Sequence, residues 1–315
     1  MKHLSSGLKA FLRISISALL IGFFFYKTDT SKFLTTLGDI SPSTWLLAFS
    51  LHILAQIICV SRWKILSRAI GFLGSWAQFF VFYFIGMFFN LFLPTSIGGD
   101  VLKAFFLSRG EGKKIPAAYS VLADRVFGMV SLILIGSITM LIFPDILPPI
   151  FRNLLYLGGL GAIAIIFFPL KIFQLMEKLL PALASKLSLV IIYWKRPPVL
   201  SSAVFLSFLL QLLGTATLPI LAHAIQIEQP IALYFAALPL IGIAMLAPVS
   251  LGGLGIREGG FIYLLGLKGV PMEKALVLSL GFFALHAITG LFGGVIYSLG
   301  LHKKEEVVYV PVDLS

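Results

Sequence analysis

The sequence predicts an all-α integral membrane protein. Of its 315 residues, 59% are apolar and only 12% are charged, and the mean hydropathy is +1.02. Soluble domains carry about 25% charged residues, and this chain has too few polar side chains to cover a water-soluble globule. We predict about eight membrane segments of roughly 20 residues each, joined by short loops.

The predicted segments are apolar runs bounded by polar or charged residues. In chain order they are Leu8–Tyr26, Thr44–Val60, Gln78–Leu93, Val126–Phe143, Leu154–Leu170, Ser201–Ala222, Ile231–Ala247 and Ala275–Leu299. Two further runs, Val101–Leu107 and Gly260–Leu267, are too short to cross a bilayer as helices. Each follows a glycine-rich break, so we predict that each belongs to a re-entrant element.

The distribution of lysine and arginine predicts the orientation, because positively charged loops stay in the cytoplasm. Basic clusters near the N-terminus, after the second segment, at 103–114 and at 171–196 all fall on that side if the third segment is re-entrant. We expect residues 1–302 to form one transmembrane domain and 303–315 a short cytoplasmic tail, with both termini cytoplasmic. Lys268 and Lys274 would be external, which counts against this arrangement.

The net charge of +11 does not indicate a nucleic-acid partner. The basic residues sit mostly in short loops, as the positive-inside rule and anionic headgroups require. Cys59 is the only cysteine, so the sequence contains no disulfide framework and no paired-cysteine metal site. The N-terminal segment lacks a small-residue cleavage site and is expected to remain as the first helix.

Two glycine-rich breaks share one pattern. Pro94 to Gly99 and Pro248 to Gly253 align proline, serine and two glycines at an offset of 154 residues, and Lys103 falls on Arg257. The flanking segments share nearly the same offset. We predict two inverted four-element repeats, at about 8–143 and 154–300, a pattern typical of secondary transporters. The alternative is a chance match, because glycine and proline are common in membrane helices.

The candidate substrate-binding residues cluster at the two breaks. Glycines allow close backbone approach, and each following short helix presents N–H groups and a positive dipole end. Two such ends facing each other suit a phosphate, with an arginine binding it bidentately and a lysine acting as a point charge. The predicted set is Asn90, Ser96, Gly98, Gly99, Asp100, Lys103, Arg125, Ser250, Gly252, Gly253, Arg257 and Glu258.

Two of these residues, Asp100 and Glu258, are carboxylates at predicted membrane depth, where such groups are costly and usually functional. Each is expected to pair with the basic residue of the opposite repeat or to carry a coupling proton. The alternative is that Asp100, Lys103 and Arg257 lie at the interface, where long basic side chains snorkel. Asn90 is expected mainly to satisfy backbone groups freed by the first break.

Several other polar residues have structural interpretations. Arg62 and Trp63 are typical of an interfacial anchor. Arg125 is expected to reach another segment or a lipid phosphate, because it cannot face its neighbour on the same helix.

The histidines His52, His223 and His286 lie on separate segments without metal-ligand spacing, and we expect packed or interfacial side chains. A proton relay through His52 or His286 stays open as an alternative. Nucleophile, metal and nucleotide motifs are absent from the sequence. We therefore expect no cofactor, no metal site and no enzymatic activity.

Several of these motifs resemble the flippase-like membrane-domain family, which includes the membrane region of lysylphosphatidylglycerol synthetases. They are Asn90-Leu91-Phe92-Leu93-Pro94 leading into Gly98-Gly99-Asp100 and Lys103, then Pro248, Gly252-Gly253-Leu254-Gly255 and Arg257-Glu258. Arg62-Trp63 and Asp124-Arg125 also resemble family positions, with Asp124 where the family more often has Glu. The resemblance covers essentially the whole chain.

The resemblance implies a multi-pass protein of prokaryotic plasma membranes that moves a lipid between leaflets. We expect the chain to lack the aminoacyl transferase that follows this domain in the synthetases. The predicted substrate and partner is an anionic membrane lipid, of phospholipid or polyprenyl-phosphate type. A transporter of a small soluble anion and a membrane-embedded lipid-modifying enzyme are the alternatives, and a homodimer could form through the small residues at Gly290–Gly294.

Overall fold

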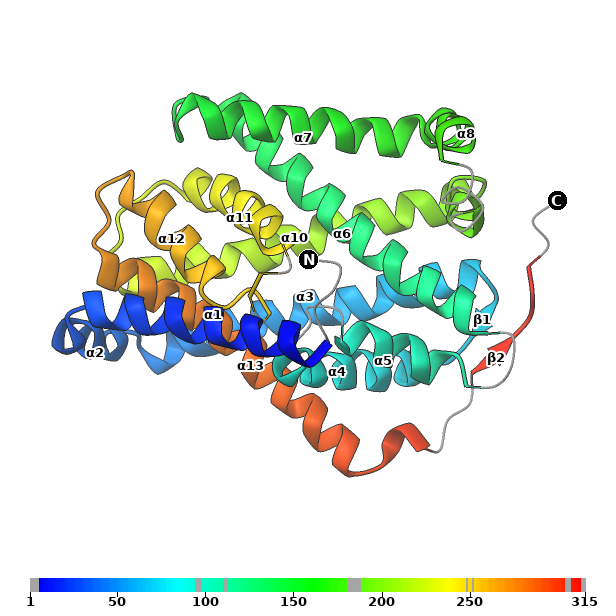
Figure 1. The fold of residues 1–315 in the computed structure, drawn as a ribbon, viewed down its shortest axis with the longest axis horizontal. Helices are drawn as coiled ribbons and strands as arrows, with labels where there is room; N and C mark the ends of the chain where they lie inside the picture. The colour runs from blue at the N-terminus through cyan, green and yellow to red at the C-terminus, as the bar shows by residue number, and fades with distance from the viewer. Residues whose placement is uncertain are drawn as a thin grey trace.

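The computed structural model describes residues 6–93, 98–109, 113–180, 188–247, 249–250, 252–303 and 307–312. Nearly all of the elements in these ranges are helices (Figure 1). They are α1 (Ser6–Lys27), α2 (Thr30–Gly38), α3 (Pro42–Ala69), β1 (Phe72–Leu73), α4 (Trp76–Phe92), α5 (Gly98–Leu107), α6 (Lys114–Ile142), α7 (Pro149–Phe167), α8 (Pro169–Leu179), η1 (Ser188–Tyr193), α10 (Pro197–Ala224), α11 (Ile231–Met245), α12 (Ile256–Gly266), α13 (Met272–Ser298), η2 (Leu301–Lys303) and β2 (Val308–Tyr309).

Polar side chains cap the starts of helices that a membrane would otherwise leave with unpaired N–H groups. At α3, the Thr44 N–H donates to Ser41 Oγ at 3.2 Å. At α4, Ser75 and Gln78 form a reciprocal capping box, in which each backbone N–H donates to the other's side chain. These caps explain why α3 and α4 begin before the apolar runs themselves.

The prediction of an all-helical membrane protein is confirmed, apart from one short pair of strands. Within the described residues, α3, α6, α7, α10 and α13 are long and apolar enough to cross a bilayer. Three shorter apolar helices, Ile14–Lys27, Trp76–Phe92 and Ile231–Met245, match the remaining predicted segments. α3 and α6 extend well beyond their predicted limits because the structure buries charged residues that end the apolar runs.

The helices of the two halves of the chain pack across one another. α3 packs along α10, α4 along α13, and α6 along α11, while α4 also packs on α5 and α11 on α12. α3 and α10 have 28 residues each and begin 155 residues apart (197 minus 42). α4 and α11 also begin 155 residues apart (231 minus 76). The same order of helices, with nearly the same spacing, thus occurs twice.

α4 packs against the small-residue face of α13 in the same chain. A Cβ added to Gly293 would overlap the Phe84 carbonyl, and Gly290 and Gly294 meet the side chains of Leu91 and Phe88. The dimer surface suggested by the sequence is therefore covered within the monomer, because α4 needs glycine there to approach closely.

Apolar side chains cover much of the outside. Leu157, Leu160 and Phe167 on α7 are 69%, 66% and 71% exposed, and α7 lies along one edge of the molecule (Figure 1). A patch of this kind is typical of a surface that faces lipid.

The C-terminal segment pairs with the connection between α3 and α4. β2 runs antiparallel to β1, and the Val310 N–H donates to the Gly71 carbonyl at 2.9 Å. The Tyr309 ring packs on Phe72 with centroids 4.8 Å apart. The tail and this loop thus lie on the same side of the molecule, as the predicted topology requires.

Candidate functional site

Two adjoining cavities lie between the halves of the chain. Their volumes are about 450 and 250 Å³, and they share the lining residues Cys59, Tyr83, Met87, Asn90, Leu132 and Gln211. The larger cavity also contacts Arg257, His52 and His286. The smaller one contacts Asp100, Lys103, Arg125 and the Arg62–Asp124 pair. Residues predicted from both glycine breaks therefore line two cavities that share part of their walls.

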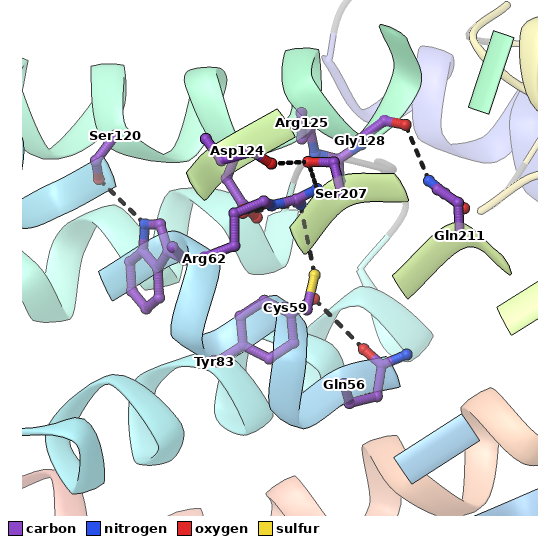
Figure 2. Close-up of polar contacts among 12 residues, drawn as sticks. Gln56, Cys59, Arg62, Tyr83, Ser120, Asp124, Arg125, Gly128, Ser207 and Gln211 are labelled. Carbon is purple, nitrogen blue, oxygen red and sulfur yellow. Dashed lines mark hydrogen bonds and ion pairs between the residues drawn. The ribbon is translucent and has the colours of Figure 1, made fainter. Parts of the chain in front are cut away.

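Arg62 on α3 is held within the protein by hydrogen bonds to two other helices. Its Nε donates to Asp124 Oδ1 on α6 at 2.8 Å, and its Nη1 donates to Ser207 Oγ on α10 at 2.8 Å (Figure 2). Only 3% of Arg62 and none of Trp63 is exposed. The prediction of an interfacial anchor is wrong, because α3 continues past these residues and α6 supplies a carboxylate that pairs with the arginine.

Lys103 on α5 lies between two carboxylates. Its Nζ is 3.7 Å from Asp100 Oδ1 and 3.6 Å from Asp124 Oδ2. The same ammonium lies 4.8 Å from the ring centroid of Trp63 and 4.4 Å from that of Tyr83. Both are cation–π contacts. Only 4% of Lys103 is exposed, so it is not a snorkelling interfacial residue.

Arg125 closes the cluster by pairing with Asp100 through its Nε. The five residues form an alternating series of charges, Arg62–Asp124–Lys103–Asp100–Arg125, with a formal net charge of +1 from three cations and two carboxylates. The Arg125 side chain is 44% exposed, against 9% for its partner. It reaches another helix, as predicted, and ends the series on its more open side.

Asn90 at the end of α4 ties that helix to the start of α5. Its Oδ1 accepts the Gly99 N–H at 2.8 Å. A Cβ at Gly99 would overlap the Gly86 carbonyl of α4. The predicted structural role of Asn90 is confirmed, and the N–H group of Gly99 is already occupied. Gly98 begins α5 directly beside Leu93.

The charged residues of the second break pair with each other and with the start of α12. Glu258, which is fully buried, accepts the Gly255 N–H at 2.6 Å and the Arg257 Nε–H at 3.0 Å. Ser279 Oγ lies 3.4 Å from the same carboxylate. Arg257 also stacks over Phe283, with its guanidinium carbon 4.3 Å from the ring centroid. Arg257 lines the larger cavity, and Glu258 is not among the lining residues.

The pairing of each carboxylate with the basic residue of the opposite repeat is not observed. Asp100 pairs with Lys103 and Arg125, and Glu258 pairs with the adjacent Arg257. Glu258 reaches its neighbour because its side chain turns back to cap the start of α12, where Gly255 has φ of +86°. This carboxylate also occupies an N–H group that we expected to be available to a phosphate.

The remaining predicted residues surround these contacts. Gly252 and Gly253 have φ of +56° and +81°, in the left-handed region that favours glycine. A Cβ at Gly252 would lie 3.9 Å from the Asn90 carbonyl, so the two breaks approach each other here. Ser250 is buried, and its hydroxyl has no hydrogen-bond partner among the described residues. Ser96 lies outside the described residues.

Sequence analysis missed the pairing of His52 with His286. Their ring centroids are 4.3 Å apart at the wall of the larger cavity. His223, by contrast, is exposed at the end of α10. His52 and His286 are 234 positions apart in the sequence (286 minus 52), and no local motif connects them. Among the described residues, no group of three His, Cys, Asp or Glu side chains could hold a metal ion.

A comparison with known families identifies the whole membrane region. A family model described as the lysylphosphatidylglycerol synthase transmembrane region matches residues 10–294. The chain belongs to this family. Every residue of the site, from His52 to His286, lies within the matched range. The expected resemblance is confirmed, and the protein is a multi-pass membrane protein.

Curated relatives of this family member include two archaeal proteins named only as UPF0104 membrane proteins. The one from Methanocaldococcus jannaschii is 29% identical over 120 residues, which is 38% of this chain and 36% of the relative. The one from Methanothermobacter thermautotrophicus is 28% identical over 131 residues, 41% of this chain and 36% of the relative. The matches span little more than a third of each relative.

Proposed function

We propose that this protein moves an anionic lipid, of phospholipid or polyprenyl-phosphate type, between membrane leaflets. The observation that carries the proposal is the lining of the two adjoining cavities. It includes four cationic side chains, Arg62, Lys103, Arg125 and Arg257, and the carboxylates of Asp100 and Asp124. With Glu258, which pairs with Arg257 outside the lining, three carboxylates stand against the four cations. The excess of positive charge in a buried site favours a ligand with a negative charge.

The composition of the larger cavity favours a lipid over a soluble anion. Most of its lining side chains are apolar, among them Met87, Leu132, Ile241 and Phe282, and the cationic group stands at one part of the wall. A headgroup in this region and acyl or prenyl chains outside it would avoid the cost of moving a charged group through hydrocarbon.

In our proposal, side chains rather than free helix ends bind the phosphate. The Gly99 and Gly255 N–H groups already donate to Asn90 and Glu258. Arg257 binds the phosphate bidentately from the second break by turning from Glu258 to the ligand. Arg125 and Lys103 bind it from the first, and Lys103 stays beside the Asp100 carboxylate when Arg125 leaves it.

The repeated order of helices supports two inverted repeats that exchange conformations. α3 to α6 and α10 to α13 share their spacing, and each half packs its helices on equivalent partners in the other. In the proposed arrangement α4–α5 and α11–α12 are re-entrant, both termini are cytoplasmic, and rocking of one half against the other opens the cavities alternately.

Leaflet exchange in proteoliposomes tests the proposal. We would reconstitute the full chain with labelled phosphatidylglycerol, cardiolipin or a polyprenyl phosphate, with and without an imposed proton gradient. We expect exchange of at least one lipid, reduced about tenfold or more in Arg257→Ala because a charge-assisted hydrogen bond is lost. Asp100→Asn should reduce exchange as well, since it removes the carboxylate between Arg125 and Lys103.

Arg152→Ala is the matched control, because Arg152 lies outside both cavities, near Asp145 in the turn before α7. It should exchange lipid at the wild-type rate. Failure of the wild type to move any of these lipids would refute the proposal. Uptake of a soluble anion would instead support a small-anion carrier, and a change in lipid masses would indicate a lipid-modifying enzyme.

A further inference from the structure

The larger cavity has a feature that anion binding does not require. His52 on α3 and His286 on α13 stand together in its wall, with ring centroids 4.3 Å apart and planes inclined at 60°. Only 1% of His52 is exposed. The rings come from different halves of the chain and face the same cavity as Arg257.

Hydrogen bonds determine which nitrogens carry hydrogen in the neutral pair. His286 Nδ1 lies 3.0 Å from the Phe282 carbonyl, and a carbonyl only accepts, so this nitrogen carries the hydrogen. Its Nε2 is then the basic atom. Tyr83 donates to Gln56 Oε1, which turns the Gln56 amide nitrogen toward His52 Nε2 at 3.5 Å. His52 therefore accepts a hydrogen bond at Nε2.

The surrounding charges determine when this pair can hold a proton. The helices around the pair carry ionisable groups that include Cys59, Arg62, Lys64 and Arg68 on α3, Tyr83 on α4, Asp100 and Lys103 on α5, Lys114, Tyr119, Asp124 and Arg125 on α6, the exposed His223 on α10, Tyr234 on α11, Arg257, Glu258 and Tyr263 on α12, exposed Lys32 on α2, and Glu273, Lys274 and Tyr297 on α13. Of these groups, Cys59, Tyr83 and Arg257 line the same cavity as His52 and His286, and Arg257 is the cation among the three. Glu258 pairs with Arg257 and does not line the cavity.

A cation at Arg257 disfavours a second positive charge on the histidines while the cavity is empty. A phosphate bound to Arg257 reverses this, because its negative charge then faces the histidine pair across the cavity. Two imidazolium rings in contact would repel each other, so the pair suits one proton rather than two.

We propose that His286 Nε2, supported by the His52 ring, is a proton-binding site, and this inference rests on the proposed function. The site takes up its proton when an anionic headgroup occupies the cavity. The bound proton offsets the charge of the phosphate, so the headgroup crosses the membrane interior with less net charge. By linkage, the anion promotes proton binding as much as the proton promotes anion binding. A proton gradient can then drive net movement of the lipid.

Proton uptake on ligand binding tests this inference directly. Full-length protein in weakly buffered detergent solution at pH 6.5 would be mixed with dihexanoyl phosphatidylglycerol. A pH-indicator dye would report proton uptake, and calorimetry would report binding. We expect uptake of up to about one proton per protein, and a Kd that rises by up to about tenfold per pH unit as the pair loses its proton.

Four variants test whether the histidine pair is the source of the proton uptake. His286→Asn keeps a donor for the Phe282 carbonyl but has no basic nitrogen, so it should bind the lipid with no proton uptake and with a flat pH dependence. His52→Gln should reduce uptake, and His286→Gln is a second replacement should the asparagine variant fail to fold. His223→Gln removes the exposed histidine of α10 and should behave as wild type.

The outcomes distinguish this inference from the function on which it rests. Lipid binding without proton uptake, or uptake unchanged in His286→Asn and His286→Gln, would overturn the proton site and leave the lipid translocator standing. No binding of the lipid between pH 5.5 and 8 would overturn both.

Discussion

Lys103 and Arg257 occupy matching positions in the two halves of the chain, 154 residues apart, but their surroundings differ. Lys103 lies between Asp100 and Asp124, and the residues 154 positions later are Leu254 and Leu278. Arg257 instead pairs with its own neighbour, Glu258. One half has a network that spans three helices, and the other has a local pair beside a helix start.

The difference indicates how each half can respond to a ligand. In the first half, Lys103 has two carboxylates at similar distances, so a phosphate that takes Arg125 leaves Asp100 with another partner. In the second half, Glu258 keeps the Gly255 N–H when Arg257 turns to a ligand. Both arrangements avoid an unpaired buried carboxylate, whose cost would oppose binding.

The largest effect should come from breaking the network at its most buried end. Arg62→Ala leaves Asp124 without its closest partner and should lower the free energy of unfolding by about 3–5 kcal/mol, as for one partner of a buried ion pair. Unfolding in detergent, followed by circular dichroism, would measure it. A loss no greater than that of the half-buried Arg152→Ala would show that the network contributes little to stability.

A smaller loss of stability is expected from alanine at the matching glycines Gly99 and Gly253. Gly99→Ala places a methyl against the Gly86 backbone carbonyl, which cannot yield, and should cost about 1–3 kcal/mol through overpacking. Gly253→Ala meets the flexible Met245 side chain, so its main cost is about 1–2 kcal/mol for alanine at a positive φ. Thermal stability of the two variants would compare them. Equal stability, or a more stable Gly99→Ala, would contradict the close approach of α4 and α5.

The cap at the first break should have an effect of similar or smaller size. Asn90→Ala leaves the buried Gly99 N–H without its acceptor and should cost about 1 kcal/mol, typical of a lost helix cap. Asn90→Asp keeps an acceptor and is the matched control in the same denaturation measurement. The second half has alanine at the matching position, Ala244, and uses Glu258 as its cap. If Asn90→Ala were as stable as wild type, the cap would be unimportant.

The smallest effect is expected at Ser279, which occupies the position matching Arg125. Its hydroxyl lies 3.4 Å from Glu258, a long contact to a carboxylate that has two closer donors. Ser279→Ala should therefore cost about 0.5–1.5 kcal/mol at most and leave lipid exchange near the wild-type rate. A loss of exchange as large as that of Arg257→Ala would show that Ser279 contacts the ligand.

Much of the site was predictable from residue type and spacing. Of the predicted residues, the cavity linings include Asn90, Asp100, Lys103, Arg125, Gly252 and Arg257. Gly99 donates to Asn90, and Gly98 begins α5 beside Leu93. Glu258 was placed in the binding set, but it lies behind Arg257 as a cap. Arg62 was assigned to the interface, because a charge at the end of an apolar run looks the same whether it meets water or a buried partner such as Asp124.

By itself the sequence determined that lipid surrounds this chain, which segments become membrane helices, and where glycines interrupt them. These are local properties, because hydrophobicity and helix breaking depend on residues within one or two turns. The tertiary structure alone decided the partners: Arg62 with Asp124, Lys103 between two carboxylates, and His52 beside His286. Such pairs depend on how α3, α5, α6 and α13 pack. Composition and local spacing do not specify contacts between residues that are far apart in the chain.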